Sequence, residues 1–201
     1  MIKRTIIAVL ATLGTLVGLG VAPASAAPNA ICSGTLAAGT YKNVTVAPGA
    51  NCFVGTNVTI LGNFRATRSP GSVIVRTDVG RNFMVAGATV RVIFGPKGCR
   101  VDPRAGNNLM VRNSRNVAIC FATVDNNIVL RNNTGRLMLR DSLACNNIRV
   151  VNNDVLGLRV LRNRYEGNFT VARNDVQNVR RVEGNHEFAA ASNPAECRRV
   201  T

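Results

Sequence analysis

One short pattern recurs along this chain at a nearly constant interval, and it constrains the fold more than any other feature. The pattern is an asparagine followed by an apolar, a variable and another apolar residue. It begins at seven positions: Asn43, Asn63, Asn82, Asn108, Asn127, Asn147 and Asn168. The intervals are 20, 19, 26, 19, 20 and 21 residues. A period of this length is typical of a solenoid, in which each repeat forms one coil stacked on the next.

A second series of similar segments lies between members of the first. These segments begin at Asn57, Ser72, Thr89, Asn116, Arg136, Gly157 and Asn178. In both series apolar and variable residues alternate, which is the period-two pattern of a strand with one buried face. Two interleaved series indicate two strands per coil. The sequence therefore predicts an all-β fold, a right-handed parallel β-helix of about seven coils.

The alternation also predicts which side chains form the core. In the first series the inward pairs are Val44/Val46, Phe64/Ala66, Phe83/Val85, Leu109/Val111, Ile128/Leu130, Ile148/Val150 and Phe169/Val171. Further asparagines follow the strands, at positions 113, 132, 152, 163 and 174. Asparagine tolerates the left-handed backbone of a sharp corner. Stacked in register, such amides are expected to form ladders along the solenoid.

The N-terminus has the three parts of a secretory signal peptide. Lys3 and Arg4 give a positive start, residues 6–21 are apolar, and residues 24–26 read Ala-Ser-Ala. We expect cleavage after Ala26, because a small-residue site of this kind follows the apolar region. The mature chain would then be secreted, with no stable membrane anchor and an extracellular location.

The remaining chain divides into one domain with two ends. We expect residues 27–40 to cap the first coil, residues 41–185 to form the β-helix and residues 186–201 to form a C-terminal cap or tail. The single 26-residue interval indicates an insertion loop at 94–107, which is rich in Gly, Pro and charge. Solenoids need such caps because their terminal strands otherwise offer unpaired edges.

All six cysteines follow the expected cleavage site. They are Cys32, Cys52, Cys99, Cys120, Cys145 and Cys197. An even number in an exported chain favours disulfides over metal ligation. The pairing of Cys32 with Cys52 is predicted at the N-terminal end. Cys99, Cys120 and Cys145 fall on successive coils, and which two of them join, and whether Cys197 pairs with the third, stays open.

Two repeated phrases, NNIVLRNN at 126–133 and NNIRVVNN at 146–153, accompany the signal peptide and a cysteine near the C-terminus. Together they resemble the small secreted right-handed parallel β-helix proteins of actinobacteria. The resemblance covers most of residues 39–185 and implies a fold rather than an activity. Larger β-helix proteins include polysaccharide lyases, hydrolases and adhesins, and the fold alone does not choose among them.

The sequence offers little for catalysis. Enzymes of this architecture use clustered carboxylates, and only Asp154 and Asp175 occupy matching positions on adjacent coils. They form the alternative carboxylate site, although Asp is also an ordinary corner residue. His186 is the only histidine and no C-x-x-C pair occurs. We therefore assign no catalytic residue, metal or cofactor.

The charge points to polyanions. The formal charge is +15, or about +13 without Lys3 and Arg4, and arginine supplies nearly all of it. If the inward positions are correct, arginines project outward on both sheets, and a ladder of them suits a linear polyanion. A solvated face is the alternative. The candidate polyanion-binding residues are Arg65, Arg112, Arg131, Arg140, Arg149 and Arg159.

The leading hypothesis is a non-enzymatic structural or adhesive protein that contacts an anionic cell-wall or extracellular polysaccharide through its arginines. The alternative is a small polysaccharide lyase or hydrolase acting on acidic glycans. Nucleic acid is not an expected partner, because the chain has no Trp and two Tyr on which bases could stack. Self-assembly is a third hypothesis, through the outward apolar residues Met84, Met110, Val129 and Val151.

Overall fold

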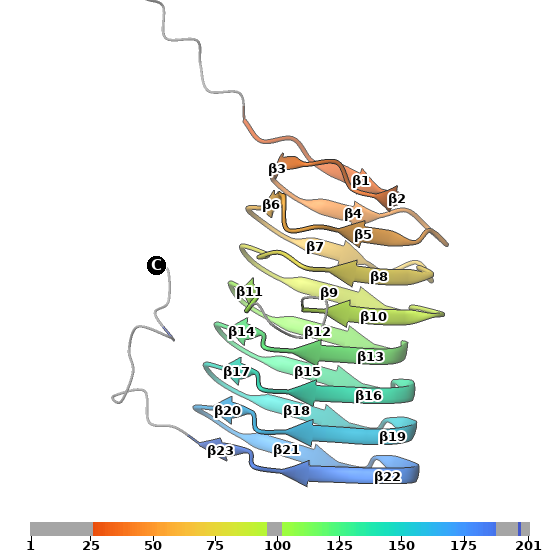
Figure 1. Ribbon diagram of the computed structural model, residues 1–201, viewed down its shortest axis with the longest axis vertical. Helices are drawn as coiled ribbons and strands as arrows, with labels where there is room; N and C mark the ends of the chain where they lie inside the picture. The colour runs from red at the N-terminus through yellow and green to blue at the C-terminus, as the bar shows by residue number, and fades with distance from the viewer. Residues whose placement is uncertain (1–25, 96–101, 188–196, 198–201) are drawn as a thin grey trace, which may run out of the picture.

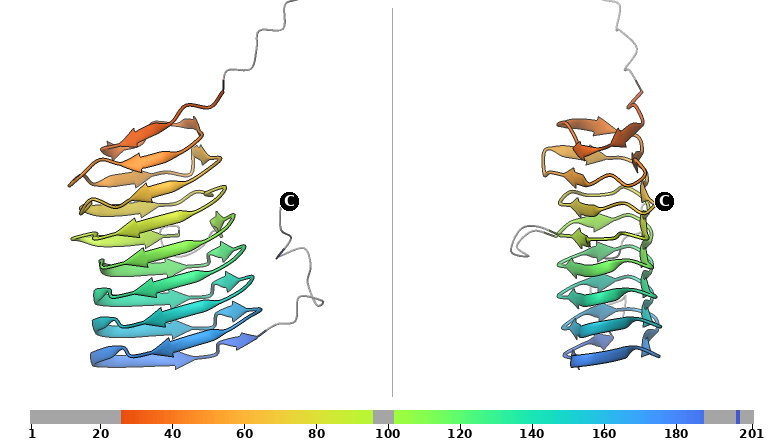
Figure 2. Two further views of the ribbon diagram at one scale, coloured as in Figure 1. Left: turned by 180° about the vertical axis from the view of Figure 1, so that it is seen from behind. Right: turned by 90° about the vertical axis from the view of Figure 1, so that its right-hand side faces the viewer.

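The computed structural model describes residues 26–95, 102–187 and 197. Within these residues the chain is all-β, and its strands stack as a parallel solenoid of about seven coils (Figure 1). The coils lie one above the other in a single straight column (Figure 2). The predicted fold class is thus confirmed as a parallel β-solenoid.

Two long sheets run the length of the column, and each has eight strands. The first sheet contains β1 (Ala30–Cys32), β4 (Val44–Val46), β7 (Phe64–Ala66), β9 (Phe83–Ala86), β12 (Leu109–Arg112), β15 (Ile128–Arg131), β18 (Ile148–Val151) and β21 (Phe169–Ala172). The second contains β2 (Gly34–Thr35), β5 (Cys52–Val54), β8 (Ser72–Val75), β10 (Arg91–Phe94), β13 (Arg115–Cys120), β16 (Thr134–Arg140), β19 (Asp154–Leu161) and β22 (Asp175–Glu183).

A third side of each coil carries shorter strands. Its sheet contains β11 (Arg104–Ala105), β14 (Thr123–Val124), β17 (Leu143–Ala144), β20 (Arg164–Tyr165) and β23 (His186–Glu187). Nearer the N-terminus, β3 (Gly39–Tyr41) pairs with β6 (Val58–Ile60), and bridges from Ile60 to Val79 and from Val79 to Ala105 continue the row. The sequence predicts two strands per coil, and this third side is an addition to that prediction.

The structure confirms every predicted strand of the first series. Its seven units coincide with β4 to β21, and the eighth strand, β1, comes from the segment expected to cap the first coil. The units stack residue on residue: Leu109 lies opposite Ile128, and Ile128 opposite Ile148. The common phase of the repeat therefore sets the register of the sheet.

The prediction for one unit of the second series is wrong, because that unit lies on a different side of the coil from the others. The segment beginning at Asn57 forms β6 on the third side, and the second-sheet strand of that coil is β5. In β5 the inward residues are Cys52 and Val54, both buried. The two segments alternate alike, so periodicity does not distinguish the sides.

The inward residues of the first series form the core as predicted. Those of its first six units, from Val44 to Val150, are all buried. Phe83 stacks between Phe64 and Phe94, with ring centroids 5.3 and 4.5 Å away. Phe169 and Val171 are only half-buried, because no described strand covers the last coil.

Asparagine ladders hold the corners of successive coils together. In the longest, the side-chain amides of Asn63, Asn82, Asn108, Asn127 and Asn147 each donate to Oδ1 of the equivalent residue one coil earlier, at 2.8–3.2 Å. The same Oδ1 atoms accept backbone N–H groups. Each amide thus satisfies the corner backbone of the next coil.

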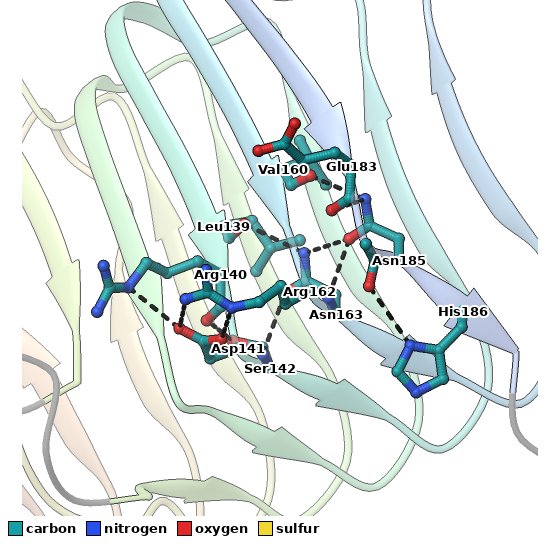
Figure 3. A network of polar contacts seen from close by, with 11 residues as sticks. Leu139, Arg140, Asp141, Ser142, Val160, Arg162, Asn163, Glu183, Asn185 and His186 are labelled. Atoms are coloured by element: carbon teal, nitrogen blue, oxygen red, sulfur yellow. Dashed lines mark hydrogen bonds and ion pairs between the residues drawn. The ribbon is translucent and has the colours of Figure 1, made fainter.

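The predicted corner asparagines divide into two kinds. Asn113, Asn132 and Asn152 have the left-handed backbone, with φ of 50°, 53° and 56°. Asn163 and Asn174 instead belong to ladders that point inward. Asn163 Nδ2 donates to Asn185 Oδ1 at 2.8 Å, and its Oδ1 accepts the backbone N–H of Ser142 (Figure 3).

One disulfide lies at the N-terminal end of the column, and another starts from the residue that follows β17. The predicted bridge between Cys32 and Cys52 is present, and Cys145 is joined to Cys197. Cys120 is also disulfide-bonded, so no bridge links it to Cys145. Cys99, the tip of the expected insertion and most of the expected C-terminal tail lie outside the described residues, as do residues 1–25 of the expected signal peptide.

Candidate functional site

The register shows how the six candidate arginines are distributed. Arg65, Arg112, Arg131 and Arg149 lie exposed on the first sheet, whereas Arg140 and Arg159 belong to the second. They do not form one ladder. Between Arg65 and Arg149 the same row contains Met84, Met110 and Val129. The structure therefore separates the arginines into distinct surfaces.

The second sheet carries a groove of about 810 Å³ that runs across four consecutive strands from β10 to β19 and reaches β22. Its floor is apolar, because Ile93, Ala118 and Met138 project outward from successive strands. Three exposed arginines line it: Arg91, Arg136 and Arg159. We call this surface the arginine groove.

One wall of the groove results from a column of β-bulges. The register shifts between Arg115 and Val117, between Gly135 and Arg136, and between Val155 and Gly157. A bulge bends its strand and redirects the neighbouring side chain. Positive φ values at Asn116 (50°) and Gly135 (73°) accompany the bend.

Asn116 fixes the backbone at the middle of this wall. Its Nδ2 donates to the carbonyl oxygen of Val90 at 3.0 Å, and its Oδ1 accepts the backbone N–H of Arg136 at 3.1 Å. Three coils are thereby joined through one side chain. The Cα of Arg136, and hence the base of its side chain, is held in place beside the groove.

Every charged side chain that lines the groove is an arginine. None of its lining residues is acidic. Within residues 26–95 and 102–187, Arg91, Arg136 and Arg159 make no ion pair with a carboxylate, unlike Arg140, Arg162 and Arg181. Unpaired guanidinium groups above an apolar floor favour an anionic ligand that also presents an apolar face.

Arg140, one of the six candidates, lies outside the groove in a cluster with Asp141 and Arg162 (Figure 3). Its Nε lies 3.3 Å from Asp141 Oδ2, and its guanidinium lies over the Phe121 ring. Arg162 donates two hydrogen bonds to the same carboxylate, at 2.7 and 2.8 Å. These hydrogen bonds, and then the attraction of Asp141, raise the pKa of Arg162 above its ordinary value. Arg140 is therefore already paired.

Two other hollows border the third side of the solenoid. One, of about 580 Å³, is lined by Asp78, Asp102 and Asp141 together with Arg104, Arg162 and Arg164. The other, of about 1000 Å³, has five asparagines in its lining, and there Arg104 and Asp125 are only 2.8 Å apart. Their positive and negative groups offset one another, so neither attracts a polyanion as the arginine groove does.

The two residues of the alternative carboxylate site lie next to each other on adjacent strands. Asp154 and Asp175 are register partners at the starts of β19 and β22, and both are exposed. The described residues contain no group of three or more His, Cys, Asp or Glu side chains able to hold a metal ion. They also contain no helix long and apolar enough to cross a membrane.

Sequence reasoning placed Arg159 in the candidate set but left out Arg91 and Arg136. Arg136 occupies the position at which most other repeat units carry Asn or a small residue, and this departure was the available signal. Comparisons with protein-family models, curated proteins and solved structures find no match to this chain. The geometry of the site is therefore the basis for function.

Proposed function

We propose that this protein is secreted and binds acidic polysaccharide chains along the arginine groove, in an adhesive or structural role at the cell wall or in the extracellular matrix. The observation that carries the proposal is the presence of Arg91, Arg136 and Arg159, from three strands of the second sheet, along a groove without carboxylates. The groove crosses the strands, so it follows the solenoid axis. From β10 to β19 it spans about 14 Å at roughly 4.8 Å per strand.

The chemistry of an acidic glycan matches this surface. Its carboxylate or sulfate groups pair with guanidinium groups, for which two-pronged hydrogen bonding is favourable. The C–H faces of its sugar rings pack on Ile93, Ala118 and Met138. The strands fix the backbone positions of all these residues, so no backbone segment has to become ordered on binding.

Export supports the same role. The Lys3-to-Ala26 segment has the order of a signal peptide. The Cys32–Cys52 and Cys145–Cys197 disulfides persist in oxidising compartments such as the extracellular space. An extracellular location also gives the protein access to acidic glycans.

The test is retention of the purified protein on immobilised polygalacturonate. Retention should fall steeply with added salt, because exposed charges are screened. Substituting the three groove arginines with glutamine should weaken binding about tenfold, at roughly 0.5 kcal/mol per exposed ion pair. The matched control is Arg68→Gln/Arg173→Gln/Arg180→Gln, which removes the same charge from exposed positions outside the groove.

If both triple variants lost the same share of their retention, the attraction would be non-specific, and the groove would not be the binding site. The same polymer also tests the enzymatic alternative. Depolymerisation by the wild-type protein that disappears in Asp154→Ala/Asp175→Ala would make the protein a glycan-degrading enzyme instead. No change in polymer length is the expected result.

A further inference from the structure

The first sheet presents a second basic surface, separate from the arginine groove. In register, its central outward row reads Thr45, Arg65, Met84, Met110, Val129, Arg149 and Thr170. The neighbouring outward row reads Ala86, Arg112, Arg131, Val151 and Ala172. Neither row contains a carboxylate. An apolar centre is thus bordered by four arginines.

The side chains of this surface are available to a partner. Arg65, Arg112, Arg131 and Arg149 are exposed, and none forms an ion pair within residues 26–95 and 102–187. Met84, Met110 and Val129 are partly exposed between them. Val151, predicted to extend this apolar stripe, is instead buried at 7% exposure. The apolar centre therefore consists of three residues.

Arg112 and Arg131 lie side by side on this surface. They are register partners on β12 and β15, so their backbones are about 4.8 Å apart. Two guanidinium groups on adjacent strands repel each other unless an anion lies between them. A phosphate group, which accepts several hydrogen bonds at once, fits this pair. Met110 and Val129 lie two residues earlier on the same strands.

We propose that the outward face of the first sheet, which we call the arginine-ringed face, docks on bilayers that contain anionic phospholipid. A phospholipid surface supplies both required features, phosphate groups for the arginines and apolar chain beneath the headgroups for Met84, Met110 and Val129. The surface of a straight parallel sheet is extended (Figure 2), and the arginine groove and the two hollows described above are lined by other residues. It therefore matches a broad, flat partner.

A second copy of the chain is a poor partner for this face. Placing two copies face to face would bring arginine against arginine, with no acidic residue on either outward row. Like charges at close range oppose association. An acidic protein is the remaining alternative, and the experiment distinguishes it.

The test is co-sedimentation of the purified protein with vesicles of phosphatidylcholine, with and without phosphatidylglycerol. Binding should require the anionic lipid. Arg112→Gln/Arg131→Gln should reduce the partition coefficient about 30-fold, at roughly 1 kcal/mol per basic residue near an anionic leaflet. Arg115→Gln/Arg180→Gln, on the second sheet and outside the arginine groove, is the control with the same charge loss and should bind about as tightly as the wild-type protein.

Met84→Gln/Met110→Gln should weaken binding several-fold at high salt, where the apolar contacts contribute most of the remaining attraction. Circular dichroism confirms that each variant is folded. Three results would overturn the proposal: equal binding to neutral vesicles, equal losses in the two arginine variants, or binding to soluble polyglutamate without binding to anionic vesicles. Because polygalacturonate retention depends on the other face, the two proposals fail independently.

Discussion

The buried asparagine ladder gives the sharpest prediction about stability. Asn153 is 1% exposed and lies between Asn133 and Asn174 on the adjacent coils. Its Oδ1 accepts the backbone N–H of Asn133 at 2.8 Å and the Asn133 amide at 3.0 Å. Its Nδ2 donates to Asn174 Oδ1 at 2.7 Å and to the carbonyl oxygen of Leu130 at 3.2 Å.

Changing Asn153 to Ala removes all four of these hydrogen bonds. The backbone N–H of Asn133, a fully buried residue, then has no acceptor from Asn153, whereas the Asn133 amide keeps its hydrogen bond to the carbonyl oxygen of Val111 at 3.2 Å. Each buried group left unsatisfied costs about 1–3 kcal/mol. With about 1 kcal/mol for the hydrogen bond that the Asn133 amide loses, the free energy of unfolding should therefore fall by about 2–4 kcal/mol.

The comparison variant is Asn126→Ala, which removes three hydrogen bonds between side chains from a half-buried ladder. Water can reach the partners there, so the expected loss is about 1 kcal/mol. Urea unfolding followed by far-ultraviolet circular dichroism measures both values. If Asn153→Ala costs no more than Asn126→Ala, burial of the ladder is not the source of its strength.

Three further predictions concern other parts of the column. Changing Cys145 and Cys197 to Ser should lower the free energy of unfolding by about 4 kcal/mol, because the bridge closes a 52-residue separation, and unchanged urea unfolding would contradict this. Gly106→Ala should lower the thermal midpoint, since its Cβ would meet a carbonyl oxygen of the preceding coil, and an unchanged midpoint would show that the coils can separate there. The raised pKa of Arg162 means that its bond to Asp141 contributes fully below the ordinary arginine pKa and is lost only as pH rises through the higher folded value. The stability difference between wild type and Arg162→Gln should therefore be constant from neutral to mildly alkaline pH, and a decline across that range would refute this assignment.

The first sheet was predictable from sequence because an asparagine directly precedes each of its strands. That residue sets the phase of the apolar alternation, and its amide binds the equivalent residue one coil away, as Asn127 does with Asn108. The third side was not predictable. Its later strands, such as β14 and β17, contain two residues each, too few to show an alternation.

The arginine groove was only partly predictable. Alternation indicates that Arg159 points outward, but it does not show that Arg159 shares a groove with Arg91, three strands earlier. The position of Arg136 depends on a bulge at Gly135, where the register departs from the period. The separation of the six candidate arginines likewise follows from pairing, which places Met110 and Val129 between the positions of Arg65 and Arg149.

The central claim, that the groove binds an acidic glycan along the solenoid axis, is tested most directly by calorimetric titration with oligogalacturonates of increasing length. Affinity should rise with each added sugar until the chain reaches from Arg91 to Arg159, about 14 Å at roughly 4.8 Å per strand, and then level off. In Arg159→Gln the plateau should come at a shorter chain. An affinity that is independent of length, or a plateau at the same length in Arg159→Gln, would contradict the claim.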